Sequence, residues 1–445
     1  MSELRFPDSP VFYRVLDRSF LEVVRGEGVF LYDAGGRRYM DGCGGALVVN
    51  IGHGRQEVAA AMAEQAGRVA YAHGSMFTAS VIEDLSAALV ELLPDELDKI
   101  YLVNGGTEAT ETAIKLARQF HLARGRMNKH RVVGLRPSYH GNTLGALSAS
   151  GREPLRKPYE PMLSDFPRIP APYCYRCPWR LSPTECAVKC ADELDILLES
   201  DGAGSFSAFI AEPIGGSSTG ATVPPPGYFP RIREICNRHD VLFIADEVLT
   251  GMGRTGRYLA LEHFDVVPDM ILLGKGLSSG YIPAGALGVG TSIVETVREE
   301  FGNFTHGYTY SHHPVVAAGC REVLAVLKRE HLVERAETQG RYLFEKLQDL
   351  QQFPVVGDIR GRGLLVGVEI VSDRKTQTPF PRSRKWIEEL TRRAFDKGLL
   401  VYPSTGCADG VEGDLFNLAP PLVIEEGEID QMVSILKKIF EEMEP

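Results

Sequence analysis

A lysine stands between two glycines directly after a short apolar run. Met270–Leu273 are all apolar and are followed by Gly274-Lys275-Gly276. A lysine at the partly desolvated end of a strand has a lowered pKa, which suits an amine that forms Schiff bases. Taken alone, such a lysine is more often an ordinary surface lysine, because the glycines add only room for a bulky adduct near the backbone.

A carboxylate ends a second apolar run. Asp246 follows Phe243-Ile244-Ala245, and an ionised group at the end of a buried strand is costly unless it is paired. A pyridinium nitrogen would be such a partner, because the carboxylate would keep it protonated and make the ring an electron sink. A metal-binding or loop-bracing aspartate is the alternative.

Glycines and a threonine connect a third apolar run, Ile100–Val103, to a segment with helical spacing. The connection reads Asn104-Gly105-Gly106-Thr107. Free N–H groups at such a helix N-terminus point at one spot and suit a phosphate dianion. A well-capped helix without a ligand gives the same pattern.

Two loops carry further polar groups. Tyr139-His140-Gly141 offers a flat ring that could stack on a planar cofactor. The loop Gly307–Ser311 contains Thr309, whose hydroxyl could hold a phosphate oxygen. A turn aromatic and an ordinary polar loop are the simpler explanations.

The elements that would position these residues indicate an α/β fold. Near-continuous apolar runs at 100–103, 208–211, 241–245 and 270–273 are typical of strands buried on both faces of a mostly parallel sheet. Helix-period segments separate them, so we expect a large domain over residues 61–314. An early hairpin around Asp33–Gly36, with amphipathic segments after Pro314, predicts a smaller α+β domain built from residues 1–60 and 315–445.

Composition limits the partners. The 445-residue chain has a net charge of −11 and no basic cluster, which argues against nucleic acid. It has neither a signal-like N-terminus nor a run of about 20 apolar residues, so we expect a cytoplasmic protein that does not enter a membrane. Its partners should be small molecules or other subunits.

Together, in this order, these segments resemble the motif series of the class III aminotransferases over nearly the whole chain. The resemblance implies a fold-type I enzyme with a mixed seven-stranded sheet, pyridoxal phosphate (PLP) as cofactor, and a homodimer with active sites shared across the interface. Lys275 would carry the cofactor and Asp246 would pair with its ring nitrogen. The cofactor-binding residues implied are Gly106, Thr107, Tyr139, His140, Glu212, Asp246, Val248, Lys275 and Thr309. Of these, Gly106 and Thr107 would bind the phosphate, Tyr139 and Val248 would sandwich the ring, and Thr309 would reach the neighbouring subunit's cofactor.

The activity implied is omega-transaminase-like. An amine or an ω- or β-amino acid would give its amino group to an oxo acid such as pyruvate, with ping-pong kinetics. A same-fold aminomutase or decarboxylase would keep Lys275 and Asp246, so the motifs leave these alternatives open. A non-catalytic, metal-clustered regulatory protein is a third alternative, which the presence of both residues disfavours.

The chain departs from the family where a substrate carboxylate is usually bound. Asn417, not an arginine, precedes Leu418-Ala419-Pro420-Pro421-Leu422, so Glu212 loses an expected partner. Upstream, Tyr402 stands near the place of a mobile arginine, and the following segment 403–414 contains none. The residue that binds a carboxylate is therefore unassigned. We expect the substrate pocket to include Ala46, Leu47, Tyr139 and Tyr402, with modest side chains on the Ala46 side.

Four cysteines cluster in a segment that none of these roles uses. Cys174 and Cys177 form a CxxC pair, and Cys186 and Cys190 follow. Four thiolates could bind zinc or an iron–sulfur cluster. The second pair has a three-residue spacing unlike ribbon-type zinc sites, so buried thiols or a redox disulfide are the alternatives.

Overall fold

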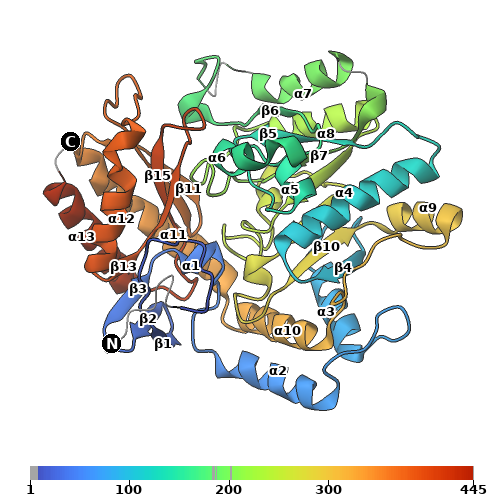
Figure 1. Ribbon diagram of the computed structural model, residues 1–445, viewed down its shortest axis with the longest axis horizontal. Helices are drawn as coiled ribbons and strands as arrows, with labels where there is room; N and C mark the ends of the chain where they lie inside the picture. Colours follow the sequence, from blue (N-terminus) through green and yellow to red (C-terminus); the bar gives the residue numbers. More distant parts are fainter. Residues whose placement is uncertain (1–8, 183–185, 187, 201–202, 444–445) are drawn as a thin grey trace.

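The computed structural model describes residues 9–182, 186, 188–200 and 203–443. Its largest sheet has seven strands in the order β4-β10-β9-β8-β7-β5-β6 (Figure 1). Strands β9, β8, β7, β5 and β6 are parallel, whereas β10 is antiparallel to both of its neighbours. The bounds are β4 (Lys99–Val103), β5 (Arg131–Arg136), β6 (Arg168–Pro170), β7 (Phe206–Ala211), β8 (Leu242–Asp246), β9 (Met270–Leu273) and β10 (Gly285–Val289).

Helices cover both faces of this sheet, because successive residues of a strand point to opposite sides. On one face Phe209 and Phe243 pack with α7 (Lys189–Ser200) and α8 (Tyr228–Arg238). On the other face Leu242 and Ile244 pack against the apolar side of α4 (Gly106–Ala123). Every residue of β7, β8 and β9 is buried, which explains why these strands are continuous apolar runs in the sequence.

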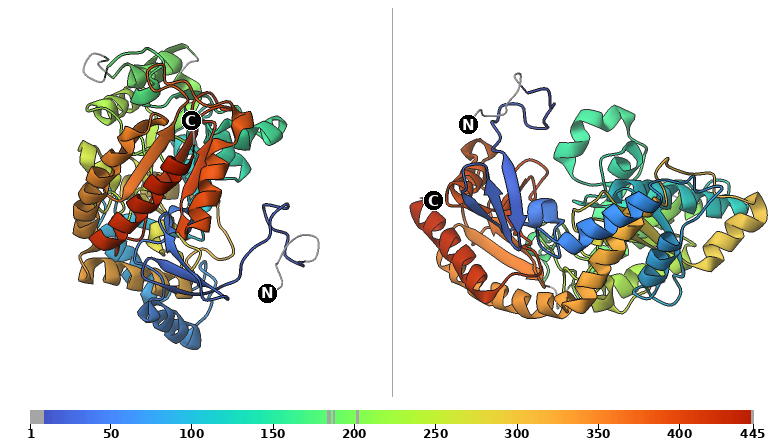
Figure 2. Two further views of the ribbon diagram at one scale, coloured as in Figure 1. Left: turned by 90° about the vertical axis from the view of Figure 1, so that its left-hand side faces the viewer. Right: turned by 90° about the horizontal axis from the view of Figure 1, so that it is seen from below.

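Two smaller sheets lie beside this layer. One, β1 (Val23–Glu27), β2 (Phe30–Asp33), β3 (Arg38–Asp41) and β13 (Leu399–Leu400), joins both ends of the chain through the parallel β3–β13 pair (Figure 2). The other is antiparallel and consists of β11 (Val356–Arg362), β12 (Leu365–Ile370), β15 (Asp414–Leu418) and β14 (Tyr402–Thr405). The pairing of β3 with β13 agrees with the smaller domain that the sequence indicates, whose boundaries stay a prediction.

The remaining helices connect and cover these sheets. They are α1 (Gly44–Leu47), α2 (Gln56–Arg68), α3 (Ser80–Val90), α5 (Leu144–Ala149), α6 (Glu153–Arg156), α9 (Thr291–Phe301), α10 (Pro314–Arg329), α11 (Leu332–Leu347), α12 (Trp386–Asp396) and α13 (Glu426–Glu442). Short 3₁₀ segments are η1 (Lys157–Met162), η2 (Cys174–Arg176), η3 (Ala203–Ser205), η4 (Ala260–Phe264), η5 (Lys275–Leu277), η6 (Gln348–Gln352) and η7 (Arg382–Arg384). In the described part of the chain, no helix has the length and apolar character needed to cross a bilayer.

The predicted hairpin and the four apolar runs are confirmed as β2–β3, β4, β7, β8 and β9. Strand β10 was not predicted. Its sequence, Gly285-Ala-Leu-Gly-Val289, contains two glycines that weaken the strand signal, and its antiparallel direction depends on contacts with β4 and β9.

Candidate active site

The motifs far apart in the sequence meet at one edge of the seven-stranded sheet. Parallel strands β8 and β9 end there, and polar residues follow each of them. A Cβ placed on Gly274 would lie 3.0 Å from Val248 Cγ1 and 3.4 Å from Gly106 Cα. The lysine loop, the segment after Asp246 and the start of α4 are therefore in contact.

Asp246 is buried and held on two sides. Its Oδ1 accepts the Val248 N–H at 3.1 Å, and its Oδ2 lies 2.7 Å from His140 Nδ1. The His140 backbone is fixed in turn, since its N–H donates to Ser150 Oγ at 2.9 Å and its carbonyl accepts from the Thr110 hydroxyl at 2.9 Å. A carboxylate with a fixed orientation thus faces this edge of the sheet.

Lys275 begins the loop after β9 with a positive φ of 40°. Burial lowers the pKa of its ammonium group, while Glu212 and Asp246 act in the opposite direction. The lysine therefore lies close to both carboxylates. A larger population of neutral amine at a given pH favours its action as a nucleophile and as a proton carrier.

The N-terminus of α4 has no side-chain cap. Its N-cap residue is Gly105, which leaves the first N–H groups of the helix without a side-chain acceptor. The Thr107 hydroxyl lies 2.8 Å from Thr143 Oγ1. At Gly141, with φ of 136°, a Cβ would lie 2.2 Å from Thr107 Oγ1, so only glycine leaves this cradle open. Thr143 was not predicted, and its only sequence signal is its place after His140-Gly141-Asn142.

Glu212 lies beside these groups without the arginine that the family pattern places near it. Its carboxylate accepts the backbone N–H groups of Tyr139 at 3.2 Å and Gly216 at 3.1 Å. Burial raises the pKa of Glu212 to about 7. Asn417 is fully buried, and no described residue bonds its side-chain amide. The ion pair expected between Glu212 and an arginine is therefore absent from the described part of the chain, and the Glu212 carboxyl and the Asn417 amide are separate polar groups.

The structure brings two of the predicted pocket residues together and places the others separately. Leu47 and Tyr402 pack in one apolar cluster with Ile214 and Leu249, so the structure brings two sides of the predicted pocket together. Tyr139 is half-buried, and burial raises the pKa of its hydroxyl. Ala46 is exposed on the irregular helix α1.

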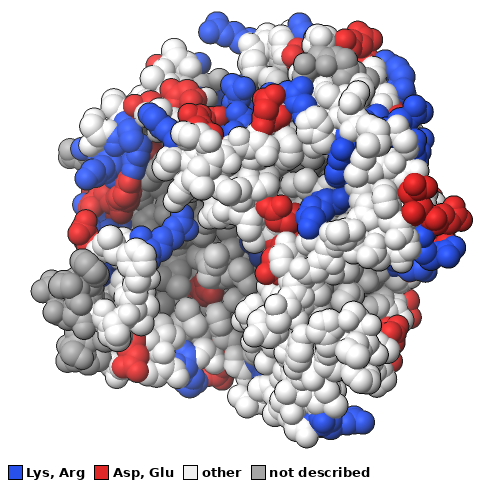
Figure 3. Space-filling view, turned by 45° about the vertical axis from the view of Figure 1, so that its right-hand side comes forward, with Lys and Arg blue, Asp and Glu red and all other residues white. Residues whose placement is uncertain are grey.

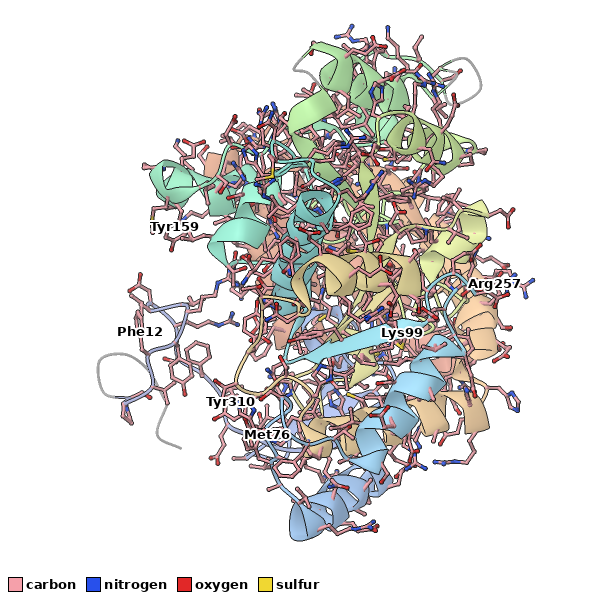
Figure 4. All side chains as sticks on the ribbon, turned by 90° about the vertical axis from the view of Figure 1, so that its right-hand side faces the viewer. Phe12, Met76, Lys99, Tyr159, Arg257 and Tyr310 are labelled. Atoms are coloured by element: carbon pink, nitrogen blue, oxygen red, sulfur yellow. The ribbon has the colours of Figure 1, made fainter. Side chains whose placement is uncertain are left out.

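Thr309 lies apart from this cluster, in an exposed loop, where its carbonyl accepts a hydrogen bond from Tyr71 Oη at 2.9 Å. Large apolar side chains are exposed around it, including Met76, at 75%, and Tyr310. Figure 4 shows Phe12, Met76, Tyr159 and Tyr310 on the same side of the molecule. Figure 3 shows a largely uncharged area toward the lower right of the face drawn there. Such an uncovered apolar surface is typical of a protein interface.

The four cysteines are neighbours in the fold, but their sulfur atoms do not form a close group of potential metal ligands. Cys174, Cys177, Cys186 and Cys190 line one small cavity. Burial, with the neighbouring thiols, raises the pKa of Cys190 to about 12. Among the described residues, the group whose potential ligand atoms all lie within 4.8 Å is Asp195, Glu199 and His239, not these cysteines. Metal binding by the cysteines stays a prediction.

A family model for class-III aminotransferases matches residues 12–440. The chain belongs to the class III aminotransferases. It is 41% identical over 424 residues to the uncharacterized aminotransferase YodT of Bacillus subtilis, covering 95% of each chain. It is 33% identical to the putrescine–pyruvate aminotransferase of Pseudomonas aeruginosa, covering 94% of this chain and 91% of that one. A solved (S)-enantioselective omega-transaminase from Thermomicrobium roseum has a TM-score of 0.91 at 36% identity, covering 97% of this chain and 95% of that one.

This aminotransferase therefore has the fold-type I architecture and is a PLP-dependent transaminase, as the motifs predicted. Its residues fit that cofactor. The glycine cradle at α4 leaves room and N–H donors for a phosphate, Asp246 supplies a fixed carboxylate for a ring nitrogen, and Lys275 supplies an amine close to Asp246.

The packing around Gly106 leaves no room for a side chain, so a substitution there should weaken cofactor binding. A Cβ there would lie 2.6 Å from Val248 Cγ1, and overpacking of this kind typically costs about 1–3 kcal/mol. We expect Gly106→Ala to raise the apparent Kd of the aminotransferase for PLP by roughly tenfold, measured by absorbance titration of the apoenzyme. Gly67→Ala on α2, where a Cβ meets nothing within 4 Å, is the matched control, and equal affinities for both variants would contradict this packing.

The buried carboxyl group of Glu247 should make the stability of the fold depend on pH, independently of catalysis. It is buried, accepts hydrogen bonds from Thr250 Oγ1 and the Leu261 N–H, and burial raises its pKa from 4.5 to about 7. Between these pH values the folded chain binds a proton that the unfolded chain has lost, so this group's contribution to the free energy of unfolding falls as pH rises. The stability difference between wild type and Glu247→Gln should therefore decrease by up to about 3 kcal/mol over that range, measured by urea unfolding. A difference that is independent of pH would show that Glu247 is not protonated in the folded state.

Proposed function

We propose that this enzyme transfers an amino group from an amine or an ω- or β-amino acid to an oxo acid such as pyruvate, with PLP carried on Lys275. The observation that supports this best is the convergence of Lys275, Asp246 and the open N-terminus of α4 at one sheet edge. The putrescine–pyruvate enzyme at 33% identity and the (S)-selective omega-transaminase at 36% identity support the choice of substrate class.

When bound, PLP supplies a carbonyl group that takes up amino groups and a ring that accepts the electron pair of a broken C–H bond. The protein's own groups position and assist that chemistry. Asp246, fixed by His140 and the Val248 N–H, holds a proton on the ring nitrogen. Gly106, Thr107 and the first N–H groups of α4 bind the phosphate, where the helix dipole favours an anion.

Lys275 acts as the base and acid at the reacting carbon. Burial lowers its pKa, so the amine released by an incoming donor can take a proton from the donor's carbon and return it. Tyr139 and Val248 would hold the ring flat from its two sides, and the apolar cluster of Leu47, Ile214 and Tyr402 would limit access of water.

The donor class is tested by the absorption spectrum of the purified protein with single donors and no acceptor. Loss of the visible cofactor band with 1-phenylethylamine, 4-aminobutyrate or a β-amino acid, followed by its recovery with pyruvate, is the expected result. Recovery that does not require an oxo acid, or release of carbon dioxide, would indicate an aminomutase or a decarboxylase instead.

We propose that the enzyme is a homodimer in which Thr309 serves the partner's site. Its exposed loop, surrounded by exposed apolar side chains, supports this assignment. We therefore expect an inactive subunit and an impaired subunit to restore activity when they are combined in one dimer. A dimer of one Lys275→Ala subunit and one Thr309→Ala subunit contains one complete site, and should recover about half of the wild-type activity at limiting PLP.

The measurement is the specific activity of tagged, purified mixed dimers. The same mixture made with Thr305→Ala, in the same exposed loop, gives the expected value for one intact site. If Thr309 acts on its own subunit's cofactor, the mixed dimer has one inactive and one impaired site, and its activity is about half that of the Thr309→Ala homodimer.

A further inference from the structure

Arg152 is a partly buried cation beside the proposed active site. It is the N-cap residue of α6. Its Nη2 donates to Ser404 Oγ on β14 at 2.8 Å, and its Nε is buried with no acceptor among the described residues. Burial lowers the pKa of its guanidinium. A charge held largely out of water without a counterion is costly, so such a group is normally paired with an anion.

The surroundings of Arg152 place it on the substrate side. The titratable groups that act on it most strongly are Tyr402, Tyr139, Arg14 and Glu212. Both tyrosines belong to the predicted substrate pocket. The tyrosines are neutral hydrogen-bonding groups at ordinary pH, and Glu212, with a pKa of about 7, carries only part of a charge. In the described part of the chain, Arg152 forms no ion pair.

Three other arginines near this region already have partners. Arg176 pairs with Glu369 at 2.5 Å, and Arg360 pairs with Glu369 and Asp358, both at 2.8 Å. Arg254 donates to the carbonyls of Leu364 and Pro420 and to Asn50 Oδ1. Arg152 also borders a cavity of about 240 Å³ with Ser218 and residues 405–410, so it adjoins open space.

We infer that Arg152, held by Ser404, binds the carboxylate of the amino acid or oxo acid substrate. This assignment rests on the proposed aminotransferase function. It supplies the cation that is missing at Asn417 and in the segment 402–414, from a different element of the fold. A carboxylate here can take two N–H donors from the guanidinium, with the Tyr402 hydroxyl as a further donor.

The test uses the holoenzyme and follows each half-reaction by the absorption of its cofactor. Arg152→Gln keeps N–H donors but removes the charge. For β-alanine, 4-aminobutyrate and pyruvate, the half-saturating concentration should rise about 10- to 100-fold, as expected for loss of a charged hydrogen bond. For 1-phenylethylamine, which has no carboxylate, both the rate and the half-saturating concentration should stay unchanged. Comparing the three carboxylates shows whether the site binds the donor, the acceptor or both.

Two further variants make the result specific. Arg152→Lys keeps the charge but loses the paired donors, so its effect should be intermediate and confined to carboxylates; it carries the test if Arg152→Gln does not fold. Arg136→Gln, which borders the same cavity, should match wild type. Equal losses with the amine and the carboxylates, or no loss with either, would overturn the assignment. If wild type itself reacts with no donor, the proposed function fails and the assignment with it.

Discussion

Replacing Lys275 with alanine should abolish both the covalent attachment of PLP and transamination. The variant lacks the amine that is both the attachment point and the proposed proton carrier. Loss of a general acid–base group alone typically lowers a rate by about 10²–10⁴-fold, and loss of the nucleophile adds to this. We therefore expect kcat for 1-phenylethylamine and pyruvate to fall by at least that factor, measured at saturating PLP so that weaker cofactor binding does not account for the loss.

Lys129→Ala is the matched control for removing a buried lysine. Lys129 is also buried, with a pKa lowered by burial, but its Nζ donates to the His239 carbonyl at 3.0 Å, in another part of the fold. This variant should lose stability and keep kcat, the reverse of the pattern for Lys275→Ala. Substantial turnover by Lys275→Ala would mean that another group moves the proton.

The second large effect concerns the charge of Asp246. Asp246→Asn keeps the shape of the side chain and removes the negative charge that would hold a proton on the ring nitrogen. Preorganised electrostatic groups of this kind are worth roughly 10²–10³-fold in kcat, so a decrease of that size is expected. The loss should appear in the rate of the donor half-reaction, measured by stopped-flow absorbance, rather than in the quantity of bound cofactor.

Asp195→Asn provides the control for disrupting an aspartate–histidine pair. Asp195 Oδ1 lies 2.7 Å from His239 Nε2, the same separation as between Asp246 and His140. We expect no change in kcat for this variant. If Asp246→Asn behaves in the same way, then Asp246 stabilises the fold and does not assist the chemistry.

The ends of the buried strands could be predicted from the sequence because burial on both faces leaves a direct signal. The runs before Asp246 and Gly274 are apolar without interruption. Asp246 and Lys275, the first charged residues after these runs, mark the edge of the sheet. Strand β10 has no such signal, because its two glycines and its antiparallel direction are determined by its neighbours.

The groups that support the site could not be predicted in the same way. His140 and Asp246 are 106 positions apart, and only the packing of β5 and β8 into one sheet brings their side chains to 2.7 Å. Arg152 has no motif at all, since its significance comes from partial burial without a counterion beside Tyr139 and Tyr402. Family patterns indicated that the usual arginines are missing, but only the three-dimensional arrangement offers a replacement.

The most direct test is to reduce the purified holoenzyme with borohydride, digest it, and locate the cofactor by peptide mass spectrometry. Reduction makes the bond between PLP and its lysine permanent, so the site of attachment can be identified without any assumption about substrate. We predict one modified peptide, with the cofactor on Lys275. Modification of a different lysine, or none in protein that has been saturated with PLP, would contradict the assignment on which the mechanism rests.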